Sequence, residues 1–121
     1  MLKENPIVDK SFDFALKVID LYKHLVYEKK EYVMSKQLLR SGTSIGANIR
    51  EANLSISKKE FIAKTQIALK EASETEYWLI LLRESDYLLE QECPMKEIDE
   101  IIRILTSILK TAKENLNAGI K

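Results

Sequence analysis

The sequence predicts an all-α protein, an antiparallel up-down four-helix bundle, and three observations carry that prediction. Apolar residues recur every three or four positions over four long stretches, which is the period of one helix face. There are three glycines and two prolines, too few for the frequent turns of a β-sandwich or barrel. No stretch shows the strict alternation of a half-buried strand. At 121 residues we expect a single domain, residues 1–121.

The first helix is expected over residues 9–29, after a loose N-terminal arm, residues 1–8, that Pro6 ends. Asp9 or Ser11 is the candidate N-cap, since either side chain accepts a hydrogen bond from a free backbone amide. The apolar stripe that follows is wide enough to contact more than one neighbour. It comprises Phe12, Phe14, Ala15, Leu16, Val18, Ile19, Leu21, Tyr22, Leu25 and Val26.

The second helix is expected over residues 32–54, after a charged turn at 28–31. Gly42 and Gly46 fall in its interior, where each glycine costs roughly 1 kcal/mol relative to alanine. Close approach of another backbone would offset that cost, so we expect a flattened helix face here. A row of polar residues on the same helix either faces solvent or lines a partner surface. That row is Gln37, Ser41, Ser44 and Asn48.

The third helix is expected over residues 57–89 and opens with a clear start signal. Ser57 and Glu60 form a capping box, in which the hydroxyl and the carboxylate each accept a free amide. Ile56 and Phe61 stand where a hydrophobic staple would pack. Small residues then share one face of the helix, which again suggests close helix contact. The fourth helix is expected over residues 95–117, after a break at Cys93-Pro94.

Catalytic and metal chemistry finds little support in these residues. His24 is the only histidine, so the Glu-x-x-His pairs of a di-iron bundle cannot form. Cys93 is alone, which rules out an intrachain disulfide and a zinc pattern. The two interior glycines follow no predicted strand, so they do not form a phosphate-binding loop. We therefore expect no enzymatic activity, no cofactor, no metal and no small-molecule substrate.

Charge and hydropathy bear on the compartment and on the partners. The 19 basic and 19 acidic residues balance, so no overall field attracts nucleic acid or an anionic membrane. No apolar run approaches the roughly 20 residues that span a bilayer. The N-terminus lacks the pattern of a signal peptide, so we expect a cytoplasmic protein without a membrane partner.

Two groups of residues are candidate sites. The first is a packing interface, which lies either between helices of one chain or between two copies of the protein. It comprises Ser41, Gly42, Ile45, Gly46, Ala68, Ala72 and Trp78. The second is a modest basic region near the turn between the second and third helices, either a solvated helix end or a contact for RNA phosphates. It comprises Arg40, Arg50, Lys58 and Lys59.

Two segments resemble the pattern of the bacterial four helix bundle protein family, named after proteins encoded in intervening sequences of 23S ribosomal RNA genes. The first segment is 39–52, Leu-Arg-Ser-Gly-Thr-Ser-Ile-Gly-Ala-Asn-Ile-Arg-Glu-Ala. The second comprises residues 57–61 and 68–79, and it ends in Glu-Tyr-Trp-Leu. Many members have Ala-Glu-Gly where this chain has Arg50-Glu51-Ala52.

The resemblance implies an antiparallel four-helix bundle that assembles into a ring, commonly a homopentamer. A related branch, the accessory protein of diversity-generating retroelements, partners a reverse transcriptase and binds nucleic acid through a basic surface. This chain lacks that branch's strong positive charge. Two functional hypotheses follow: a non-catalytic homo-oligomeric scaffold that binds a protein partner, and an RNA-binding accessory protein that repeats a basic patch around the oligomer.

Overall fold

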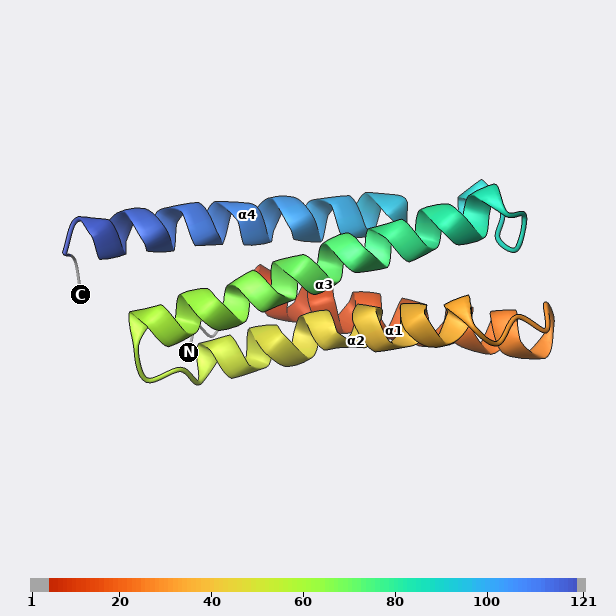
Figure 1. Ribbon diagram of the computed structural model, residues 1–121, viewed down its shortest axis with the longest axis horizontal. Helices are drawn as coiled ribbons and strands as arrows, with labels where there is room; N and C mark the ends of the chain where they lie inside the picture. The colour runs from red at the N-terminus through yellow and green to blue at the C-terminus, as the bar shows by residue number, and fades with distance from the viewer. Residues whose placement is uncertain (1–4, 120–121) are drawn as a thin grey trace.

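The computed structural model describes residues 5–119, and within that range the chain is helical with no strand. Four α-helices run alternately up and down along one long axis (Figure 1). This confirms the all-α, four-helix prediction. The helices are α1 (Pro6–Tyr27), α2 (Met34–Asn53), α3 (Lys58–Glu84) and α4 (Met95–Asn117), with a short 3-10 turn, η1 (Glu90–Glu92), before α4.

Helix α1 begins earlier than the sequence suggested. Asn5 is the N-cap, and its side-chain oxygen accepts the amide of Ile7 at 3.2 Å. Pro6 occupies the first helical position, where its fixed φ fits the helix and its missing N–H costs nothing. The predicted arm over residues 1–8 is therefore wrong for residues 5–8, and residues 1–4 lie outside the described range. Neither Asp9 nor Ser11 caps the helix.

A carboxylate caps α2 from the preceding turn. Glu31 accepts the amides of Val33, Met34 and Ser35 at 3.2, 3.0 and 2.7 Å, although the residue is only 8% exposed. In return the Ser35 hydroxyl donates to the Glu31 carbonyl oxygen at 2.7 Å. Lys30, with φ 57°, reverses the chain just before this cap. The turn that the sequence marked only as charged thus stabilises the start of α2.

Helix α3 starts as predicted but ends early. Glu60 donates its amide to the Ser57 hydroxyl at 3.1 Å, which confirms that half of the capping box. The Glu60 carboxylate accepts the amide of Ile56, one residue before the N-cap, at 3.1 Å. The staple is wrong, because Ile56 is 94% exposed. The helix ends at Glu84 and not at 89, since Asp86 adopts φ 66° and turns the following chain back into the core.

The core runs along the bundle axis and receives side chains from all four helices and from the turn before α4. Its fully buried members include Phe14, Val18, Leu25, Leu38, Ile45, Leu79, Leu82, Ile98, Ile101 and Leu105. Neighbours in sequence are neighbours in space, with α2 and α3 packed most extensively and α1 and α4 least. Hydrophobic burial on this scale supplies the main driving force for folding.

Helices α1 and α4 are offset along the axis (Figure 1). Ion pairs across this side join Lys10 to Glu100 at 2.9 Å and Lys17 to Glu97 at 2.5 Å. In antiparallel helices the Lys10 pair sets Pro6 opposite residue 104 and the Lys17 pair sets it opposite residue 108, and Pro6 lines a hollow together with both Ile104 and Ile108. The rest of α4, residues 109–117, therefore projects about 14 Å past the start of α1 at 1.5 Å per residue. Along this length α4 lies beside α3 without a neighbour on the α1 side (Figure 1).

Candidate functional site

The small residues of α2 and α3 form contacts inside the chain. A Cβ atom added to Gly42 would lie 2.8 Å from both Cγ atoms of Val18 on α1, and one added to Gly46 would lie 3.3 Å from Ser11 Oγ. On the α3 side, the hydroxyls of Ser41 and Thr75 lie 2.9 Å apart in a hydrogen bond. The glycines of α2 therefore allow α1 to pack closely, and the small residues of α3 allow α2 to pack closely. Ile45, Ala68 and Ala72 are fully buried there.

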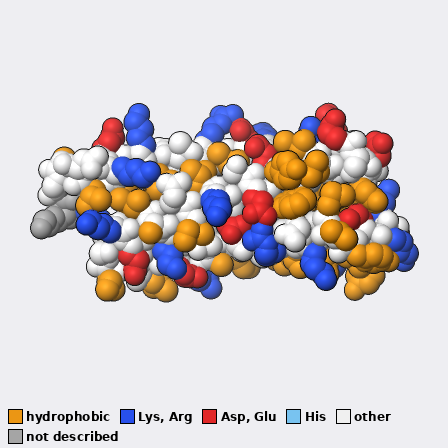
Figure 2. Space-filling view, viewed as in Figure 1, with side chains coloured by type: hydrophobic (Ala, Val, Ile, Leu, Met, Phe, Trp, Pro, Cys, Tyr) orange, Lys and Arg blue, Asp and Glu red, His pale blue; other side chains and the backbone are white. Residues whose placement is uncertain are grey.

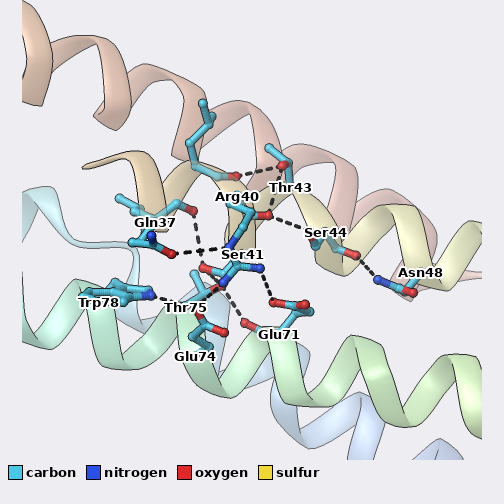
Figure 3. Close-up of polar contacts among 12 residues, drawn as sticks. Gln37, Arg40, Ser41, Thr43, Ser44, Asn48, Glu71, Glu74, Thr75 and Trp78 are labelled. Carbon is cyan, nitrogen blue, oxygen red and sulfur yellow. Dashed lines mark hydrogen bonds and ion pairs between the residues drawn. The ribbon is translucent and has the colours of Figure 1, made fainter. Parts of the chain in front are cut away.

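A polar network joins α2 to α3 on the outside of this contact (Figure 3). Arg40 points from α2 to α3, where it binds Glu71 at 3.2 Å and also pairs with Glu74. Trp78 Nε1 donates to Glu74 Oε2 at 3.0 Å, and the partly buried indole ring packs against the core. Two carboxylates thus hold the Arg40 guanidinium. The hydrogen bond to Glu74, and to a lesser extent the one to Glu71, raises the pKa of Arg40.

The polar row of α2 is satisfied within the chain. Ser44 donates to the Arg40 carbonyl oxygen at 2.6 Å, and Asn48 donates to the Ser44 carbonyl oxygen at 2.8 Å. The Gln37 side chain accepts from Arg40 Nε at 3.4 Å. Ser41 is fully buried, whereas the other three are half-buried beside α3 (Figure 3). The row therefore lines the α2–α3 seam.

Acid is expected to weaken this network through Glu74. The hydrogen bond from Trp78, reinforced by Arg40 and opposed by partial burial, holds the pKa of Glu74 below its ordinary value. A carboxyl whose pKa is lowered by folding contributes stability above its unfolded pKa, and loses that contribution as pH falls through the folded pKa. We expect Trp78→Phe to raise the Glu74 pKa, measured by NMR titration of its carboxyl carbon. Tyr77→Phe, at the exposed neighbouring ring, is the matched control, and equal shifts in both variants would contradict the assignment.

The candidate basic region does not act as one patch. Arg40 is neutralised in the network described above, so it is not available to a phosphate. Arg50 near the end of α2 and Lys58 and Lys59 at the start of α3 are exposed. Among residues 5–119, no carboxylate forms an ion pair with any of these three. Of the four predicted contacts, Arg40 is thus held by carboxylates, whereas the other three have no such partner in the described range.

An apolar strip on α1 remains uncovered by the bundle. We define the α1 strip as Phe12, Ala15, Leu16, Ile19 and Val26, which lie on the side of α1 that faces outward beside α2. Phe12 is 61% and Leu16 is 49% exposed, and the other three are half-buried. A hollow of about 280 Å³ lies beside the strip, between α1 and α2. Its lining includes Phe12, Ala15, Gly46 and Ala47, with Asp9 and Arg50 as its charged members.

A cleft between α1 and the turn before α4 contains the histidine and the cysteine. His24 Nε2 lies 3.5 Å from Glu92, and Cys93 lines the same cleft. Burial raises the pKa of the Cys93 thiol, which opposes the thiolate form that reacts. Within residues 5–119 no three His, Cys, Asp or Glu side chains gather as a metal site would need. Nor does any helix in that range have the length and apolar character to cross a membrane.

Two features escaped the sequence reasoning. The Glu31 cap was missed because glutamate is not among the preferred N-cap residues, and the neighbouring lysines suggested a solvated turn. The signal was the Glu-x-x-x-Ser spacing to Ser35, which brings both partners into reach. The uncovered end of α4 was missed because helix lengths alone do not set the offset between helices.

Together these helices define a class, the antiparallel four-helix bundles. The chain belongs to the 23S rRNA-intervening sequence protein family, whose family model matches residues 3–107. It is also similar to a crystal structure of a protein with unknown function from the S23 ribosomal protein family of Bacteroides thetaiotaomicron. The two sequences are 54% identical, and the match covers 86% of this chain and 98% of the chain in that structure. The two structures superpose with a TM-score of 0.84. Comparison with curated proteins gives no match.

Proposed function

We propose that this protein is a non-catalytic scaffold that assembles with copies of itself and presents helix faces to a protein partner. The observation that carries the proposal is the α1 strip, in which Phe12 and Leu16 are 61% and 49% exposed beside each other, because exposed apolar side chains that gather on one face are typical of a contact surface. The small-residue faces no longer support self-association, since Gly42 and Ala72 are buried inside one chain. A ring of five copies is the assembly that the family resemblance implies.

The hollow beside the α1 strip suits a second copy. Gly46 and Ala47 leave the floor of the hollow free of large side chains, so the backbone of an incoming helix can approach α2 closely. Phe12 supplies an exposed aromatic anchor beside it. Aromatic anchors contribute most to binding when a well-packed pocket receives them. Asp9 and Arg50 line the same hollow with opposite charges, which can pair across a contact between identical copies.

Self-association through the α1 strip has a direct test. We expect the double variant Phe12→Glu and Leu16→Glu to lower the mass measured by light scattering to that of a monomer, because two carboxylates would have to be buried without partners. The helix content should stay unchanged, since both side chains are exposed. Ile67→Glu, on the partly exposed face of α3, is the matched control and should keep the full mass. An unchanged mass in the double variant would overturn the proposal.

A second candidate function, RNA binding, is favoured by the unpaired cations Arg50, Lys58 and Lys59 at one end of the bundle. Repetition around an oligomer would let weak phosphate contacts add up. For nuclease-treated protein we expect affinity for a single-stranded RNA to fall steeply as salt rises, and to fall at least tenfold in Lys58→Glu with Lys59→Glu. Lys29→Glu, an exposed lysine at the opposite end, is the control. Affinity that survives the double change would remove this site.

A further inference from the structure

The offset of α4 leaves a groove at the end of the bundle, beyond the start of α1. Two hollows, of about 630 and 590 Å³, both have Ser55, Phe61 and Ile108 in their lining, and they lie next to each other between α4 and the α2–α3 turn. Ala52 and Ile104 also line the second hollow, with Pro6 at the start of α1. A longer α1 would cover this surface, but α1 starts opposite residues 104 to 108. We call the two hollows together the α4 groove.

Part of the α4 groove lies outside the family core. The family model ends at residue 107, whereas α4 continues to Asn117 and supplies Ile108, Thr111, Ala112 and Asn115 to the lining. Leu109 is 4% exposed, so the extension packs on α3 as regular structure. The groove is therefore built partly from residues beyond the matched segment.

The one charged residue that lines the α4 groove in the described part of the chain is basic. That residue is Lys58, and the exposed Lys59 and Glu60 follow it in the first turn of α3. The Glu60 carboxylate already accepts the Ile56 amide, and the helix dipole favours further negative charge at this N-terminus. In Figure 2 basic, acidic and hydrophobic side chains all lie over this left-hand end of the molecule. An acidic ligand with an apolar face matches this surface.

The apolar components are those that hold an amphipathic helix. Ile56 stands on the rim with 94% of its surface exposed, while Phe61 and Ile108 form the floor. Ser57, Ser107 and Thr111 add hydroxyls that can bond a polar edge. The projecting length of α4, about 14 Å, accommodates roughly two and a half turns of a ligand helix. Helix-in-groove recognition uses an apolar stripe at i, i+3, i+4 and i+7 on such a surface.

We propose that the α4 groove docks an acidic amphipathic helix of a partner protein, with apolar side chains against Phe61 and Ile108 and carboxylates toward Lys58 and Lys59. This deepens the proposed scaffold function by naming the chemistry of its partner. The two proposals can fail separately, because self-association depends on the α1 strip, whereas docking depends on the α4 groove.

The test uses two fluorescent helical peptides of roughly 14 residues. Both carry leucine at the four stripe positions, and one has glutamate and the other lysine over the polar face. We expect fluorescence anisotropy to show the acidic peptide binding the full-length protein at least tenfold more tightly than the basic one. Ile56→Glu and Lys58→Glu should each weaken that binding at least tenfold. The Phe12→Glu and Leu16→Glu variant, which tests self-association, should bind the peptide as the wild type does.

Several results would overturn docking of an acidic helix. Absence of binding by the acidic peptide, or equal binding by Ile56→Glu, would show that the groove does not receive it. A lower oligomer mass in Ile56→Glu would assign the groove to a second copy. Tighter peptide binding after removal of residues 1–4 would assign it to the chain's own N-terminal segment. Displacement of the peptide by single-stranded RNA at low salt, with RNA the tighter ligand, would assign it to nucleic acid.

Discussion

Gly42→Leu is expected to lower the free energy of unfolding by about 3 kcal/mol, the upper end of the usual cost of overpacking a core. Even a single Cβ atom at this position would lie 2.8 Å from both methyl groups of Val18, and Val18 is fully buried. The α1–α2 contact would have to open to admit three further carbon atoms. Urea unfolding followed by circular dichroism measures the loss.

Gly46→Leu is the matched control for this prediction. Its Cβ would meet only Ser11 Oγ at 3.3 Å, and the position borders the hollow between α1 and α2. The leucine can extend into that hollow, so we expect a smaller loss of stability than at Gly42. A second check is Gly42→Ala combined with Val18→Ala, where the removed methyl groups should restore part of the stability. Equal destabilisation by the two leucines would show that the 2.8 Å contact is not the limiting one.

Glu31→Ala is expected to lower the free energy of unfolding by about 2 kcal/mol. Loss of a helix cap costs about 0.5–2 kcal/mol, and the Glu31 carboxylate accepts three amides from a nearly buried position. The amide of Ser35 is itself buried, so water cannot fully replace the lost acceptor. Thermal and urea unfolding measure the effect.

Glu28→Ala, in the same turn but exposed, is the control for the cap and should change stability by less than about 0.5 kcal/mol. The loss of stability in Glu31→Gln should be smaller than in Glu31→Ala and larger than in Glu28→Ala, because the glutamine amide oxygen still accepts a hydrogen bond but carries no negative charge. If alanine at positions 28 and 31 gave equal losses, general charge removal rather than capping would explain them.

Local signals in the sequence predicted the structure well where both partners lie close in the chain. Ser57 and Glu60 are three residues apart, so their capping box follows from helix geometry alone. The end of α3 was harder. Leu88 continues the apolar pattern, yet it reaches the core from a turn because Asp86 takes a left-handed conformation. Periodicity does not distinguish an apolar residue on a helix from one on a returning turn.

The candidate site was predicted only in part, for a physical reason. Gly42 and Gly46 correctly indicated a close approach, but a glycine does not specify which helix approaches, and the structure assigns both to α1. Arg40 was grouped with Lys58 by charge alone, whereas its carboxylate partners Glu71 and Glu74 lie 31 and 34 residues away in sequence. Tertiary pairing, which a single sequence does not display, decides whether a basic side chain is available to a ligand.

The unequal reach of α1 and α4 also sets where this chain can tolerate a change in length. Beyond residue 108 the last helix lies beside α3 without a neighbour on the α1 side. The fully buried residues of α4, Ile98, Ile101 and Leu105, all precede this stretch. Extra or missing turns at the end of α4 would therefore change the depth of the groove while leaving most of the buried interior intact.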